Sequence, residues 1–181
     1  MLLDAAKSSL LVIDMQERLL PAMAESERVL TKTKVLMTAA QELGLPVTMS
    51  EQYPTGLGST VPELASNKAK VFEKLSFSCW RDQFFRRHFI ELHEGGRPLV
   101  IVAGIEAHVC VLQTAADMAH AGFGVYVVVD AVSSRAPESM SLAMQRLAHD
   151  GVEVVNTEMV VFELLAKAGT PQFKTLSALI K

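Results

Sequence analysis

The sequence predicts one α/β domain with three layers, in which helices cover both faces of a six-stranded parallel sheet. Short runs rich in Val, Ile and Leu alternate with longer amphipathic stretches along the chain, and this alternation is typical of βα units. The runs are apolar at consecutive positions, as strands buried on both faces are. With 181 residues, half of them hydrophobic, the chain can build one full-sized core. Residues 1–181 are therefore expected to form a single domain of Rossmann-like topology.

The first strand and helix are expected near the N-terminus. Ser9–Ile13 is apolar after its first residue, as a buried strand should be. Glu27–Leu43 carries apolar side chains at helical spacing, with Ser26 as the expected N-cap and Gly44 as the stop signal. Pro46–Ser50 predicts the second strand.

The middle of the chain contains the longest irregular stretch, Glu51–Ser66, which holds two Pro and two Gly. A short third strand is expected at Lys70–Phe72, and Trp80–His93 has helical spacing that ends before Gly95. The remaining expected elements are, in order, a strand at Pro98–Ala103, a helix at Val109–Ala121, a strand at Val125–Val129, a helix at Pro137–His149, a strand at Val152–Val155, and helices at Glu158–Lys167 and Gln172–Ile180. Ligands of such a sheet bind at the carboxyl ends of its strands.

Composition makes several partners unexpected. The net charge is −3 and no basic stripe emerges, which argues against nucleic acid or an anionic membrane surface as a partner. No apolar run approaches the ~20 residues of a membrane-spanning helix. Asp4 stands where a signal peptide would carry positive charge, so a cytoplasmic location is expected. The two terminal helices carry more apolar residues than one face of the sheet needs, which favours a homo-oligomer.

Cys110 is expected about one turn into the helix after the fourth strand. An isolated cysteine is most often a small buried hydrophobe, and that interpretation stays open. Its position near a helix N-terminus, however, would lower the pKa of the thiol and supply N–H groups for an oxyanion. Cys79 lacks such a position and is expected to pack beside Phe77 and Trp80.

Asp14 and Lys74 are polar residues at the same edge of the predicted sheet. Asp14 follows five strand residues, although it could also cap the next helix or pair with Arg18. Lys74 comes just after the third strand and means little by itself. Together with Cys110, the two residues suggest a nucleophile, a base and a cation where ligands bind.

Four motifs in order make the chain similar to a known family. Leu11–Gln16, Phe72–Ser78, Gly104–Val111 and Asp130–Arg135 resemble the isochorismatase-like cysteine hydrolases, a group that includes nicotinamidases and N-carbamoylsarcosine, ureidoacrylate and biuret-type amidohydrolases. The stretch Glu51–Gly58 is most similar to that of small isochorismatase-domain proteins of unassigned function. The resemblance covers essentially the whole chain.

The resemblance implies a catalytic triad of Asp14, Lys74 and Cys110. It also implies a non-proline cis peptide between Ile105 and Glu106, and an oxyanion hole formed by the backbone amides of Glu106 and Cys110. The implied reaction is hydrolysis of a carbon–nitrogen bond in a small amide, ureido or carbamoyl substrate through a thioester. A catalytically silent member that serves as an assembly or binding module is the main alternative.

Two departures from the family pattern narrow the expected chemistry. Members with a catalytic metal carry an Asp-x-His cluster after the second strand, where this chain has Glu51–Pro54. Two Cys and five dispersed His show no metal spacing either, so no metal and no other cofactor is expected. Isochorismatase proper lacks the cysteine and cleaves a vinyl ether, so that activity is not expected here.

The walls of the substrate pocket are expected to be apolar. Leu19, Tyr53, Phe77 and Trp80 lie in the segments most able to shape a small-molecule pocket, although ordinary core packing explains each of them equally well. A nucleotide-binding fold would need a Gly-rich turn after the first strand. Asp14–Arg18 contains no Gly, which argues against it.

Overall fold

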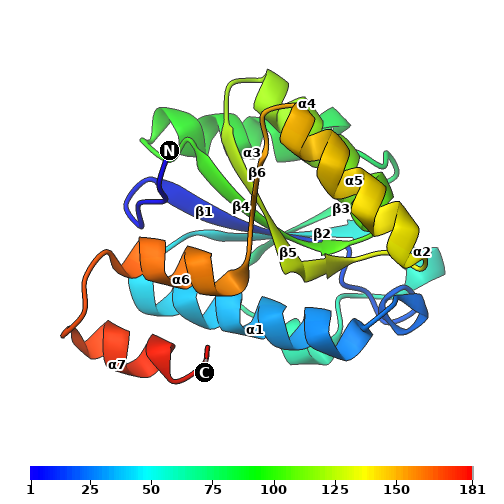
Figure 1. Ribbon diagram of the computed structural model, residues 1–181. Helices are drawn as coiled ribbons and strands as arrows, with labels where there is room; N and C mark the ends of the chain where they lie inside the picture. Colours follow the sequence, from blue (N-terminus) through cyan, green and yellow to red (C-terminus); the bar gives the residue numbers. More distant parts are fainter. Residues whose placement is uncertain (181) are drawn as a thin grey trace.

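The computed structural model, described over residues 1–180, is a three-layer α/β domain around a six-stranded parallel sheet (Figure 1). The sheet order is β3-β2-β1-β4-β5-β6, so the predicted fold class is confirmed. The strands are β1 Ser8–Ile13, β2 Val47–Gln52, β3 Lys70–Lys74, β4 Leu99–Ile105, β5 Gly124–Ser133 and β6 Glu153–Val155. β1 lies between β2 and β4 at the centre of the sheet, and all six of its residues are buried.

Helices cover the two faces of the sheet (Figure 1). α1 (Ser26–Leu43) and α6 (Thr157–Leu165) close one face, and α7 (Pro171–Ser177) packs against both of them. The other face is covered by α3 (Gln83–Glu94), α4 (Leu112–His120) and α5 (Pro137–His149). Shorter helical turns are η1 Leu20–Ala22, α2 Pro54–Leu57, η2 Pro62–Leu64, η3 Cys79–Arg81 and η4 Ala107–Val111.

Gly104 allows β4 to approach β1 closely at the carboxyl edge of the sheet. Its φ is +121°, and a Cβ there would lie 2.1 Å from the carbonyl oxygen of Ile13. Only glycine tolerates both conditions at this position. The close approach brings the end of β1, where Asp14 follows, next to the segment that carries Cys110.

Several element boundaries differ from the sequence-based expectations. β3 continues through Lys74, because Gln52 and Lys74 still pair across β2 and β3. The helix expected at Trp80–His93 is divided into η3 and α3, whose N-cap is Asp82. Ser26 does not cap α1: Glu25 occupies the cap position without a side-chain hydrogen bond, whereas Gly44 ends the helix with φ +70°.

The terminal helices bury part of their apolar surface within the chain and leave part of it exposed. Val161, Leu165 and Leu176 are buried against Val35 and Ala39 of α1 within the same chain. Phe162 and Leu179, by contrast, remain exposed. No helix in residues 1–180 is long and apolar enough to cross a membrane.

Candidate active site

The structure brings Asp14, Lys74 and Cys110 together at the carboxyl edge of the sheet. Asp14 follows β1 with φ +51°, Lys74 is the last residue of β3, and Cys110 lies in the π-helical turn η4. Lys74 Nζ is 2.8 Å from Asp14 Oδ2 and 3.6 Å from Cys110 Sγ. The relative exposures of Asp14, Lys74 and Cys110 are 0%, 5% and 6%, so this is a buried ion pair beside a buried thiol.

Each of the three protons of the Lys74 ammonium has an acceptor. Besides Asp14 and Cys110, Lys74 Nζ donates to Gln52 Oε1 at 2.7 Å. Gln52 is itself held, because its Nε2 donates to the carbonyl of Leu75 and its backbone amide donates to Gln16 Oε1. The position of the Lys74 ammonium and the directions of its N–H bonds are therefore both fixed by its neighbours.

Ser50 and Cys79 lie directly behind Asp14. Ser50 Oγ donates to Asp14 Oδ1 at 2.7 Å, and Cys79 Sγ lies 3.5 Å from Ser50 Oγ. The expectation that Cys79 only packs beside its neighbours misses this contact. Neither Ser50 nor Gln52 was a candidate from the sequence, although both are polar residues in the last three positions of a buried strand.

The electrostatics of Cys110 differ from the expectation of a lowered thiol pKa. Burial, and then the negative charge of Asp14, raise the pKa of the Cys110 thiol, and the nearby Lys74 only partly opposes them. Burial alone would lower the pKa of Lys74, but the charges of Asp14 and the two cysteines more than offset it, so the pKa is raised. The resting site at neutral pH therefore holds a protonated thiol beside an ion pair.

The turn that carries Cys110 begins at a cis peptide bond between Ile105 and Glu106. The carbonyl of Glu106 accepts hydrogen bonds from the amides of Val109 and Val111, which closes the turn around Cys110. The Glu106 carboxylate is nearly buried and binds Arg135, with 3.1 Å between Oε2 and Nε. Glu106 and Cys110 are the residues expected to supply the oxyanion hole. Glu106 thus lies at the start of this tight turn, and Cys110 lies within it.

A cavity of about 700 Å³ lies beside Lys74. Tyr53, Leu75 and Arg81 are among its lining residues, whereas Phe77 is exposed and does not line it. Leu19 and Trp80 do not line it: Leu19 packs on the core of the α1 face, and the Trp80 ring contacts that of Phe123 at 5.3 Å between centroids. The side chains of Leu19 and Trp80 point away from the cavity, which spacing along the chain does not reveal.

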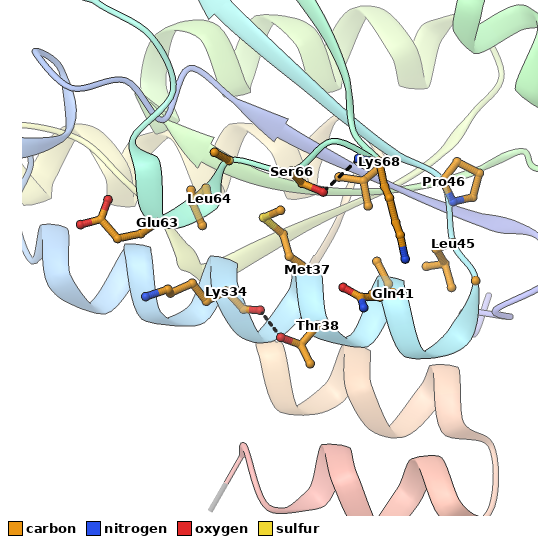
Figure 2. A pocket seen from close by; sticks show the side chains of 14 residues that line it. Lys34, Met37, Thr38, Gln41, Leu45, Pro46, Glu63, Leu64, Ser66 and Lys68 are labelled. Atoms are coloured by element: carbon orange, nitrogen blue, oxygen red, sulfur yellow. Dashed lines mark hydrogen bonds between the residues drawn. The ribbon is translucent and has the colours of Figure 1, made fainter.

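A second cavity, of about 590 Å³, lies between α1 and η2 near the start of β2 (Figure 2). Lys34 and Gln41 of α1 and Glu63 and Lys68 of the facing segment lie around it. No member of the triad lines this cavity. Within residues 1–180, no group of three or more His, Cys, Asp or Glu side chains is placed to hold a metal ion.

Comparison with known proteins identifies the family. A profile of the isochorismatase domain matches residues 8–159. The chain belongs to the isochorismatase family. Isochorismatase domain-containing protein 2 of Danio rerio is 37% identical over 98% of this chain and 89% of its own length. Isochorismatase domain-containing protein 1 of Danio rerio is 39% identical over 99% of this chain, which spans only 62% of that relative.

Another family member, the secreted isochorismatase effector Isc1 of Phytophthora sojae, is 37% identical over 96% of this chain and 84% of its own length. Among solved structures, the one described as MAR1 ribonuclease from Caenorhabditis elegans has a TM-score of 0.90 and 34% identity, covering 99% of this chain and 92% of that one. YcaC from Escherichia coli, described as an octameric hydrolase of unknown specificity, has a TM-score of 0.91 and 24% identity, covering 98% and 90%. The isochorismatase-family hydrolase fold is therefore established for this chain.

Proposed function

We propose that this isochorismatase-family protein is a metal-independent cysteine hydrolase that cleaves a carbon–nitrogen bond in a small amide, ureido or carbamoyl compound. The observation that carries the proposal is the contact of Lys74 Nζ with both Asp14 Oδ2 and Cys110 Sγ, at 2.8 and 3.6 Å. A buried Lys and a buried Asp facing a thiol have no packing rationale, because burying charges is costly. Their placement instead suits a thiol that is deprotonated only during attack.

The first half of the reaction forms a thioester. Cys110 Sγ attacks the substrate carbonyl carbon as its proton moves to Asp14, and Lys74 stabilises the charge that develops on sulfur. The amides of Glu106 and Cys110 hold the oxyanion of the tetrahedral intermediate, each such donor being worth about 3 kcal/mol. Asp14 then gives its proton to the leaving nitrogen as the carbon–nitrogen bond breaks, which leaves the acyl group on sulfur.

The second half returns the enzyme to its starting state. Asp14 takes a proton from a water molecule that attacks the thioester carbonyl, and the same amides hold the second oxyanion. When the carbon–sulfur bond breaks, the acid product leaves and the proton on Asp14 returns to Cys110. The substrate is expected to enter from the cavity beside Lys74, past Tyr53 and Leu75.

A catalytically silent role as an assembly or binding module is the second candidate. Its support is the site itself, because all three triad residues are nearly closed off from solvent and the Cys110 pKa is raised by burial. The description of the nematode structure as a ribonuclease adds a second activity to test. The net charge of −3 does not favour RNA binding by this chain.

Ammonia release from a panel of small amides, ureido and carbamoyl compounds tests the proposal. The wild-type protein is expected to turn over at least one compound, and Cys110→Ala is expected to abolish that turnover. Val125→Ala removes buried side-chain volume at the opposite end of the sheet and is the matched control, expected to lose stability but keep activity. Activity that survives in Cys110→Ala contradicts the scheme, and cleavage of RNA without any ammonia release would favour the nuclease.

We also propose that the chain forms a homo-oligomer. The support is the number of large apolar side chains that a single chain leaves exposed. Tyr53 and Leu75 are exposed at the cavity beside Lys74, and Phe162 and Leu179 are exposed near the C-terminus. Exposed apolar side chains of this size often mark protein–protein contacts. Size-exclusion chromatography with light scattering is the test, and a monomer at micromolar concentration would refute the idea.

A further inference from the structure

A row of two buried hydrogen bonds ends on the Asp14 oxygen that Lys74 does not contact. Cys79 Sγ lies 3.5 Å from Ser50 Oγ, and Ser50 Oγ lies 2.7 Å from Asp14 Oδ1. Cys79 and Asp14 have no exposed surface and Ser50 is 1% exposed, so no bulk water competes for these contacts. The proposed reaction uses neither Ser50 nor Cys79, yet the row ends on the group that accepts the thiol proton.

The direction of the hydrogen bonds follows from the number of protons available. The Asp14 carboxylate can only accept, so the single hydroxyl proton of Ser50 must point towards it. The Ser50 oxygen is then free to accept, and Cys79 is its donor. Burial raises the pKa of the Cys79 thiol to about 11, which keeps its proton in place at neutral pH. The order of donation is therefore Cys79 to Ser50 to Asp14.

Cys79 is anchored independently of the row. Its backbone amide donates to Thr114 Oγ1 of α4 at 2.9 Å, which ties η3 to the helix that follows the nucleophile turn. Ser50 is fixed by the pairing of β2 with β1, where it lies opposite Ile13. Both members of the row, Cys79 in η3 and Ser50 in β2, are thus held in place by contacts other than those of the row itself.

We propose that Ser50 is a positioning residue for the reaction, and that Cys79 sets the orientation of its hydroxyl. A hydrogen bond donated to a carboxylate stabilises the charged form and fixes which lone pairs remain for the incoming proton. Ser50 therefore holds the Asp14 carboxylate in the orientation in which it accepts the proton of Cys110. This inference rests on the proposed role of Asp14 as the base. The titratable groups that face Asp14 are Lys74, Cys79 and Cys110.

The experiment measures the rate of Cys110 alkylation by iodoacetamide against pH, by mass spectrometry of digested peptides that separate Cys110 from Cys79. The rate is expected to fall at acidic pH when Asp14 becomes protonated and can no longer take the thiol proton. We call this fall the acidic limb of the rate profile. In Ser50→Ala the acidic limb is expected to move to higher pH by about one unit, the size expected when one hydrogen bond to a carboxylate is lost. Ser50→Thr keeps the hydroxyl and is expected to restore the wild-type limb.

Ser9→Ala is the matched control. Ser9 is an equally buried strand serine, but its hydroxyl bonds only the carbonyl of Leu99, at 3.4 Å. Its removal is expected to change stability and leave the acidic limb where it was. Cys79→Ala is the second variant should Ser50→Ala fail to fold, and it is expected to move the limb in the same direction by a smaller amount.

The outcomes separate this inference from the proposed function. In one outcome, Asp14→Asn abolishes the fall of the alkylation rate at acidic pH, but Ser50→Ala and Cys79→Ala leave that fall at the wild-type pH. This outcome overturns the role of Ser50 alone. A limb that is unchanged in Asp14→Asn shows that Asp14 is not the base, and overturns the proposed mechanism together with the inference. Movement of the limb in Ser50→Ala, with none in Ser9→Ala, supports it, because a general loss of packing would not shift a pH profile selectively.

Discussion

Replacing Lys74 with methionine tests whether the buried ion pair at the centre of the site has the energetic importance that its geometry indicates. The side chains of Lys74 and Asp14 are 2% and 0% exposed, and their charged atoms are 2.8 Å apart. Methionine has a similar length and no charge, so Lys74→Met removes the ammonium with little loss of volume. Asp14 then keeps only the Ser50 hydroxyl and the Cys110 thiol as hydrogen-bond donors, and neither of them carries a positive charge.

The expected cost follows from the burial of the unpaired charge. Removing one partner of a buried ion pair typically costs about 3–5 kcal/mol, because the remaining ion has lost its solvent as well as its partner. That is a large part of the ~5–15 kcal/mol by which domains are stable. Asp14→Asn removes the charge of Asp14 and leaves Lys74 buried with Gln52. The double variant leaves no unpaired charge and is expected to recover at least ~2 kcal/mol relative to the sum of the single changes.

Urea unfolding at pH 7 provides the measurement. Trp80 is the only tryptophan of the chain, and its ring contacts Phe123 in the folded protein, so its fluorescence reports unfolding. Protein concentration is held constant because an oligomer would couple association to unfolding. Lys70→Met, at an exposed position of the same strand, is the matched control and is expected to change stability by less than ~0.5 kcal/mol.

Two results would refute the reasoning. A cost below about 1 kcal/mol for Lys74→Met would mean that water or another donor reaches Asp14, as at an exposed ion pair. Additive effects in the double variant would mean that Lys74 and Asp14 do not interact appreciably, whatever their separation.

Three further predictions concern the surroundings of the triad. Stability is expected to fall above about pH 8.5, because thiols ionise there in the unfolded chain, whereas burial raises the folded pKa of Cys79 to about 11 and also raises that of Cys110. Above that pH the folded state binds more protons than the unfolded state, so each thiol lowers the free energy of unfolding by about 1.4 kcal/mol per pH unit. Cys79→Ala should therefore reduce the slope of the free energy of unfolding against pH. Gln52→Leu removes an acceptor from the Lys74 ammonium and is expected to lower turnover at least ~10-fold with a smaller change in KM, measured by ammonia release. Gly104→Ala would place a Cβ 2.1 Å from the Ile13 carbonyl at φ +121° and is expected to cost at least ~3 kcal/mol in urea unfolding, whereas an effect under ~1 kcal/mol would contradict the close approach of the strands.

The sequence predicts the sheet and the strand ends because their signal is local. Runs such as Ser9–Ile13 are apolar on both faces, and the first polar residue after them marks the edge where ligands bind. Asp14 follows from this rule and Cys110 from its place in the helical segment after the fourth strand, and both side chains contact Lys74. The strand boundaries are less accurate, since β3 reaches Lys74 only because it pairs with β2.

The surroundings of the triad could not be predicted, because they depend on contacts between distant segments. Ser50 and Gln52 look like ordinary polar residues at the end of a strand until β1 and β3 bring Asp14 and Lys74 beside them. The same limitation explains the error about the acidity of Cys110. A position in the first turn of a helix suggests a lowered thiol pKa, but burial of the side chain, which sequence position does not give, is the larger effect and acts in the opposite direction.

A raised Cys110 pKa is compatible with catalysis because of how charge is distributed in the site. At rest, the buried charges are one ammonium and one carboxylate, and Lys74 Nζ contacts the Asp14 oxygen at 2.8 Å. When the proton moves from Cys110 to Asp14, the charges become one ammonium and one thiolate, and Lys74 Nζ already lies 3.6 Å from that sulfur. The transfer exchanges one ion pair for another around a cation fixed by Gln52, so no net charge is created in a medium that solvates charge poorly. A free thiolate would instead add a second negative charge beside Asp14, which is why the resting thiol stays protonated and why the base must lie within reach of it.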